Sequence, residues 1–130
     1  PGRILVAVGE EAPASRVAAL ESAGVTLVPC KSREGRVDVA DVCGRLYGLD
    51  VTAVLLEAGG GVGGAFLDAG LVDRGAAFIA PMLLGGARAP VPTAGAGLGL
   101  GDAVRLTDVT TRPLGDDWLI EANVSHVASA

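Results

Sequence analysis

Apolar residues occur along the chain in short continuous runs that alternate with stretches of helical spacing. The continuous runs lie at residues 3–8, 25–29, 51–56 and 78–80 and are rich in Val, Leu, Ile and Ala. A short apolar run without alternation is typical of a strand that is covered on both faces of a sheet. These runs therefore predict four buried strands.

Three segments between these runs have the spacing of amphipathic helices. Residues 15–23 form the first and end at Gly24, while the second follows Asp38, a suitable N-cap. The third runs from Val62 to Gly70, which can terminate it. The apolar positions of the second helix are Val39, Val42, Cys43, Leu46 and Tyr47, and those of the third are Val62, Ala65, Phe66 and Ala69.

The order of these elements predicts the fold class. Strands and helices alternate up to Leu84, which favours an α/β fold with a mostly parallel central sheet and helices on both faces. Residues 85–101 are rich in Gly and Ala and predict an irregular surface loop. Residues 104–111 and 118–124 predict a C-terminal antiparallel hairpin. We expect one domain over residues 1–124 and a loose tail at 125–130.

The third helix is preceded by a possible anion site. The apolar run at 51–56 leads into Glu57, and glycine occupies five of the six positions from Gly59 to Gly64. Glycine permits positive φ and close approach of a ligand, and the free amides at a helix N-terminus favour a phosphate. A tight strand-to-helix turn in a glycine-rich protein is the alternative. Glu57 could bond a ligand hydroxyl or a loop amide, and the sequence leaves both open.

The glycine spacing matches G-x-G-x-x-G at Gly59, Gly61 and Gly64, the pattern of dinucleotide-binding turns. Such a turn is usually followed, about 20 residues later, by an acidic residue that binds a ribose hydroxyl. The corresponding region, residues 78–81, contains no acid. A standard Rossmann site is therefore disfavoured.

Charge and composition exclude several classes of function. The net charge is −5 and no basic stripe is present, which argues against a nucleic-acid partner. No apolar run approaches the roughly 20 residues of a membrane-spanning helix. Cys30 and Cys43 are expected to be reduced thiols of a cytoplasmic protein. Two distant cysteines and His126 fall short of a metal site, and neither Ser125 nor the Asp116-Asp117 pair indicates catalysis, so no catalytic residue is assigned.

Three blocks of the sequence resemble the reductase domain of the riboflavin-biosynthesis deaminase/reductase family. They are Val54-Leu55-Leu56-Glu57-Ala58-Gly59-Gly60, Ala65-Phe66-Leu67-Asp68-Ala69-Gly70-Leu71-Val72-Asp73 and Ile79-Ala80-Pro81-Met82-Leu83-Leu84-Gly85-Gly86. The order and spacing of the blocks match the family. The resemblance covers about the last two-thirds of a reductase domain and lacks its N-terminal part and the deaminase domain.

The resemblance implies a dihydrofolate-reductase-like fold and NADPH-dependent reduction of the ribosyl group of 5-amino-6-(5-phosphoribosylamino)uracil to ribityl, by direct hydride transfer. It implies that Glu57 contacts the pyrimidine nucleotide substrate and that the chain forms a homodimer. The cofactor-binding residues that it implies are Gly59, Gly60, Gly61, Val62, Gly63, Gly64 and Ala65. The alternative is a non-catalytic reductase-like remnant that acts as a nucleotide-binding or dimerisation module.

Overall fold

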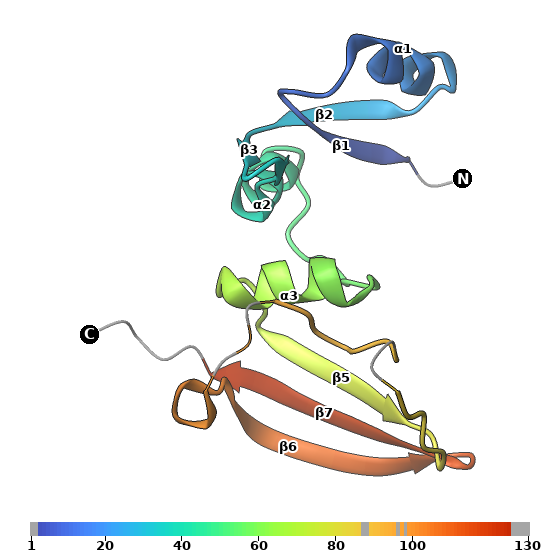
Figure 1. The fold of residues 1–130 in the computed structure, drawn as a ribbon, viewed down its shortest axis with the longest axis vertical. Coiled ribbons are helices and arrows are strands. Elements are labelled where there is room, and N and C mark those ends of the chain that lie inside the picture. Colours follow the sequence, from blue (N-terminus) through green and yellow to red (C-terminus); the bar gives the residue numbers. More distant parts are fainter. Residues whose placement is uncertain (1–2, 87–88, 96, 98, 126–130) are drawn as a thin grey trace. The chain divides into compact units, whose positions relative to one another are not determined.

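A computed structural model describes residues 3–86, 89–95, 97 and 99–125 (Figure 1). The chain forms two compact units, Pro1–Leu56 and Glu57–Ala130. This division does not test whether residues 1–124 form a single domain, and that expectation remains a prediction. No helix in the described ranges has the length and apolar character needed to cross a bilayer.

The first unit is built on a pair of parallel strands. Strand β1 (Leu5–Gly9) pairs with β2 (Thr26–Cys30), and helix α1 (Ala14–Ser22) connects them. Gly24 follows the helix with φ of 76°, the left-handed conformation that ends many helices. The strands expected at 3–8 and 25–29 and the helix expected at 15–23 are present, with bounds shifted by one or two residues. The expected burial of these strands is only partly met, because β1 has no buried residue and β2 has two, Val28 and Cys30.

A short hairpin follows β2. Strand β3 (Ser32–Arg33) pairs with β4 (Arg36–Val37) across Glu34 and Gly35, which have φ of 53° and 72°. Positive φ at both central residues is the geometry of the two-residue turns that match strand twist. This hairpin lies in a polar segment between the apolar runs, so the pattern of apolar residues did not predict it.

Helix α2 (Val39–Tyr47) confirms the strongest helical pattern of the sequence. Its N-cap is Asp38, as expected, whose Oδ1 accepts hydrogen bonds from the amides of Ala40 and Asp41 at 2.8 and 3.3 Å. The inward face differs from expectation at one position, because the side chain of Tyr47 is 74% exposed.

The strand expected at residues 51–56 is absent. Residues 51–59 have no regular secondary structure, and the side chain of Leu55 is 83% exposed. An isolated apolar run becomes a strand only where a neighbour completes its hydrogen-bond ladder, and no described strand pairs with this segment. The prediction of a strand covered on both faces is therefore wrong here.

The second unit combines one helix with an antiparallel sheet (Figure 1). Helix α3 (Gly60–Asp68) comes first, followed by strand β5 (Arg74–Ile79). The run at 78–80 thus ends a strand as expected, but the prediction that this strand is buried is wrong, because all six residues of β5 are exposed. Strands β6 (Arg105–Leu114) and β7 (Asp117–Ser125) form the expected hairpin, and the sheet order is β5-β7-β6. A 3₁₀ turn, η1 (Leu100–Asp102), precedes β6, and the described part of residues 85–101 is otherwise irregular, as expected.

The sheet topology departs from the expected one. Among the described strands only β1 and β2 are parallel, whereas β5 runs antiparallel to β7. A mixed α/β fold is therefore present, and a mostly parallel central sheet with helices on both faces is not confirmed. Ser125 ends β7, and the rest of the expected tail, residues 126–130 with His126, lies outside the described residues.

Candidate functional site

The glycine-rich segment is helical rather than a loop. Helix α3 begins at Gly60, two residues before the expected start, and Gly59 is its N-cap with φ of −66°. None of the five glycines in this segment has positive φ. These glycines therefore do not adopt the left-handed conformations expected of a glycine loop. Their lack of side chains instead allows other backbone to pack closely against the helix.

Three glycines of α3 pack against the backbone of a later segment. A Cβ at Gly60 would lie 2.5 Å from the carbonyl oxygen of Val91, and one at Gly63 would lie 3.3 Å from that of Pro92. A Cβ at Gly64 would overlap the carbonyl of Ala94. The amide of Ala94 also donates to the Gly60 carbonyl at 2.8 Å. This face of the helix is filled by the segment 91–94 of the same chain.

Two other glycines of the same segment are open. A Cβ at Gly59 or Gly61 would meet no atom within 4 Å, and both residues are exposed. The helix N-terminus therefore has a packed face and an accessible face. Only the accessible face leaves room for the backbone approach that a ligand would need.

The first amides of α3 are available on this end of the helix. The amides of Val62 and Gly63 donate to the Gly59 carbonyl at 3.1 Å, whereas those of Gly60 and Gly61 have no acceptor among the described residues. The first amides of a helix point outward along its axis and carry partial positive charge. This end of α3 can accept an anion such as a phosphate.

The remaining expected site residues lie around this N-terminus. Glu57 is exposed, three residues before the helix, and its carboxylate makes no hydrogen bond or ion pair with the described residues. Val62 is 48% exposed, and Ala65 is half-buried. Glu57, Gly59 and Gly61 are all exposed, whereas Gly64 is buried.

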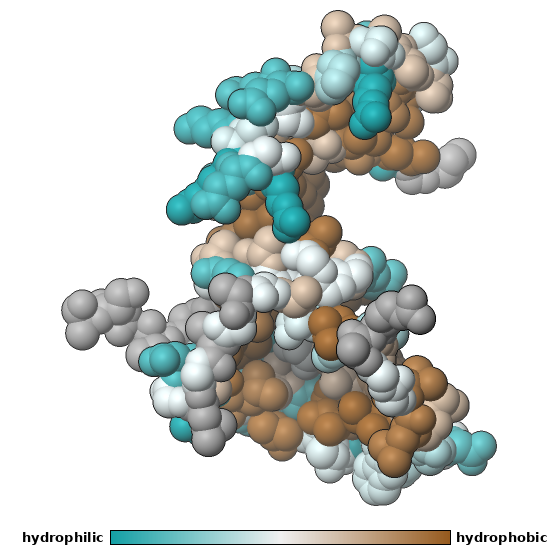
Figure 2. Space-filling model, viewed as in Figure 1, coloured by the Kyte–Doolittle hydropathy of each residue, from teal (hydrophilic) through white to brown (hydrophobic). Residues whose placement is uncertain are grey.

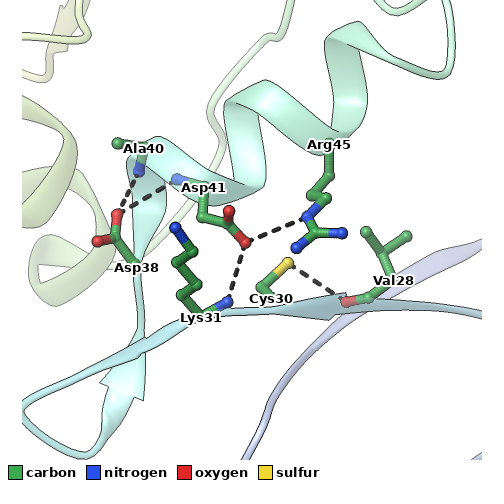
Figure 3. Close-up of polar contacts among 7 residues, drawn as sticks. All are labelled: Val28, Cys30, Lys31, Asp38, Ala40, Asp41 and Arg45. Carbon is green, nitrogen blue, oxygen red and sulfur yellow. Dashed lines mark hydrogen bonds and ion pairs between the residues drawn. The ribbon is translucent and has the colours of Figure 1, made fainter.

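A polar cluster in the first unit was not expected from the sequence (Figure 3). The Oδ2 atom of Asp41 accepts from the Lys31 amide at 2.9 Å and from Nε of Arg45 at 3.3 Å. The Lys31 amide, and after it Arg45, hold the pKa of Asp41 below its usual value. The i, i+4 spacing of Asp41 and Arg45 was the available signal. The bond between the Lys31 amide and Asp41 joins α2 to the residue that follows β2.

Cys30 lies beside this cluster and is fully buried. Its Sγ donates to the Val28 carbonyl at 3.3 Å, and burial, together with the charge of Asp41, raises its pKa. A buried thiol with a raised pKa stays protonated and is a poor nucleophile. Both Cys30 and Cys43 are free thiols, and no group of three His, Cys, Asp or Glu within the described ranges could hold a metal ion.

Comparison with known proteins identifies relatives across almost the whole chain. The family model described as RibD C-terminal domain matches residues 1–120. The riboflavin biosynthesis protein RibD of Actinobacillus pleuropneumoniae is 35% identical over 99 residues, which are 75% of this chain and 26% of that protein. A 2,5-diamino-6-ribosylamino-4(3H)-pyrimidinone 5′-phosphate reductase of Methanothermobacter thermautotrophicus is 34% identical over 121 residues, 92% of this chain and 55% of the relative.

Solved structures show the same fold. RibD of Acinetobacter baumannii superposes with a TM-score of 0.69 at 20% identity, over 93% of this chain and 31% of that chain. A pyrimidine reductase-like protein of Corynebacterium diphtheriae superposes with a TM-score of 0.73 at 18% identity, over 95% of this chain and 50% of that chain. The chain spans between 26% and 55% of the length of the two curated relatives described above.

Proposed function

The chain belongs to the RibD C-terminal domain family, and from this premise we propose that it acts as the pyrimidine reductase of riboflavin biosynthesis. The reaction is the NADPH-dependent reduction of the ribosyl group of 5-amino-6-(5-phosphoribosylamino)uracil to ribityl. The observation that carries the proposal is the family match over residues 1–120, which includes Glu57 and all of α3.

The N-terminus of α3 fits a phosphate group of the cofactor. The amides of Gly60 and Gly61 have no described acceptor, and the open Cα positions of Gly59 and Gly61 permit close approach. NADPH would supply the hydride, so the protein needs only to bind and orient the cofactor and the sugar. We assign Gly59, Gly60, Gly61, Val62, Gly63, Gly64 and Ala65 to cofactor binding. The amides and open faces of the first turn make the contact, and the packed glycines Gly60, Gly63 and Gly64 hold the helix in place.

Glu57 is the proposed substrate contact. Its exposed carboxylate is three residues from the helix and has no partner among the described residues, so its oxygens can accept hydrogen bonds from a ligand. A pyrimidine with exocyclic amino groups, or a sugar hydroxyl, offers the matching donors. Glu57→Gln keeps the shape of the side chain but removes its charge, and should raise KM for the nucleotide more than it lowers kcat.

The name of the relative from Methanothermobacter thermautotrophicus raises a second possible substrate. It specifies a diamino-pyrimidinone phosphate, which still carries the amino group that deamination would remove. Both candidate substrates are pyrimidine ribose phosphates, so the same site could take either. We propose the deaminated compound, a homodimeric assembly and a cytoplasmic location.

The direct test is NADPH oxidation with each of the two nucleotides in turn. The proposal predicts oxidation with the deaminated nucleotide, loss of that activity in Glu57→Ala, and little activity with NADPH alone. The second candidate function is a non-catalytic nucleotide-binding module, because the open first turn of α3 would bind a phosphate whether or not reduction follows. Binding of NADPH without turnover on either nucleotide would establish that module instead.

A further inference from the structure

The first half of helix α3 has little in its own sequence to keep it helical. Four of the first five residues of this nine-residue helix are glycine, a poor helix former, and isolated helices below roughly 12–15 residues are marginal. Its N-cap, Gly59, makes no side-chain hydrogen bond, and its first turn carries no acidic residue. Helix α2, of the same length, has both features, in Asp38 and Asp41.

Side-chain burial does not hold residues 60–64 in the helix either. Val62 is the only one of these five residues that has a side chain, and it is 48% exposed. Figure 2 shows mostly pale surface over α3, as expected where glycine and alanine are frequent. Contacts of the backbone therefore stabilise the helical conformation of these residues.

Those backbone contacts are made by the segment 91–94, which we call the strap. The Ala94 amide donates to the Gly60 carbonyl at 2.8 Å, and three carbonyls of the strap lie over the packed glycines of the helix. The next residue, Gly95, lies beside the other end of α3, because an added Cβ would be 3.0 Å from Oδ2 of Asp68. The strap thus follows α3 along its length.

Two prolines restrict the strap before it docks. Pro90 and Pro92 fix their own φ and bias the residue before each of them toward an extended conformation. A segment restricted in this way loses less conformational entropy when it packs against the helix.

We propose that the strap positions the phosphate-binding end of α3, so that NADPH affinity depends on residues 91–94. This inference rests on the proposed function, because it takes NADPH as the ligand of this end. The amides of Gly60 and Gly61 point outward along the helix axis only while residues 60–64 are helical. Since the strap and the ligand both favour the helical state, each strengthens the binding of the other.

The first test is hydrogen exchange without any ligand. Ala94→Pro removes the amide that donates to Gly60, and Gly64→Ala places a methyl group where a strap carbonyl lies. Each change should speed exchange of the amides of residues 62–65 by about tenfold or more, while the amides of β7 stay protected and show that the sheet is folded.

The control is Asp108→Ala, in the bulge of β6 between Thr107 and Thr110, where Asp108 has φ of 51°. It strains the same unit without touching the strap, and should leave exchange in α3 unchanged. Unchanged exchange in both strap variants, or equal acceleration in the control, would overturn the inference.

The second test is calorimetric titration with NADPH. Ala94→Pro and Gly64→Ala should each weaken binding by about tenfold or more, whereas Asp108→Ala should bind as the wild type does. The double variant should bind no more weakly than the weaker single variant, because both changes break one contact. Additive losses would contradict coupling through the strap.

The two tests separate this inference from the proposed function. A wild-type chain that does not bind NADPH would contradict the proposed function, and the exchange without ligand would still decide whether the strap holds α3. Wild-type NADPH affinity in both strap variants would overturn the inference and leave the proposed function intact.

Discussion

The glycines of α3 have different surroundings, which the sequence alone does not distinguish. Gly64 is buried against the carbonyl of Ala94, whereas a side chain at Gly61 would extend into open space. The same substitution should therefore have opposite effects at the two positions. This contrast separates the glycines required by packing from those available to a ligand.

We expect Gly64→Ala to lower the free energy of unfolding by about 1–3 kcal/mol, because its methyl group overlaps the segment 91–94. Gly61→Ala should raise it by about 0.5–1 kcal/mol, since alanine is the better helix former. Urea unfolding of both variants measures the difference. Equal stabilities would mean that the segment 91–94 does not pack on this face.

Asp41 is a second residue whose role can be measured. The Lys31 amide and Arg45 hold its pKa below the usual 3.8, so its carboxylate stabilises the folded state above that pH and ceases to do so as the pH falls through the lowered value. Asp41→Asn should therefore lower Tm at neutral pH, and the deficit should shrink in strong acid.

The control for this experiment is Asp50→Asn. Asp50 has φ of 63°, a conformation that asparagine also tolerates, and its side chain makes no hydrogen bond with the described residues. It should change Tm little at any pH. A deficit for Asp41→Asn that stays constant with pH would show that the carboxylate charge is not what stabilises α2.

Among the elements, the local ones were predictable from sequence. Helix α2 followed from its apolar spacing and the Asp38 cap, and the β6–β7 hairpin from β-branched residues around Gly115, whose φ is 62°. The strand predicted at 51–56 is absent, because a strand forms only beside a neighbouring strand, and sequence periodicity cannot show whether that neighbour exists. The start of α3 was misplaced because glycine usually interrupts helices, and only the distant segment 91–94 explains its presence there.

The bulge of β6 is a feature of one element that sequence periodicity does not predict. Asp108 adopts φ of 51°, and Asn123 on β7 bonds its carboxylate. Asp108→Ala should destabilise the chain by about 1 kcal/mol more than Asp108→Gly, since only glycine adopts this conformation without steric cost. Both variants lose the hydrogen bond, so chemical denaturation isolates the backbone effect. Equal values would argue against strain at the bulge.

At the scale of the whole molecule, the chain has the fold and the family of a RibD C-terminal domain. The chain matches 92% of its length to a named reductase yet spans 55% of that protein. The affinity for NADPH depends directly on the open first turn of α3, and the proposed reduction requires that NADPH binds. If the accessible face of α3 binds a phosphate of NADPH, blocking that face alone should abolish the contact.

Calorimetric titration with NADPH of the wild type, Gly61→Val and Gly44→Val tests this most directly. Gly44 is an exposed glycine of α2 whose added side chain would also meet no atom within 4 Å, so both variants place a β-branched residue in a helix without a steric clash. We predict that Gly61→Val weakens NADPH binding by about tenfold or more and that Gly44→Val leaves it unchanged. A folded Gly61→Val chain with wild-type affinity for NADPH would contradict the account.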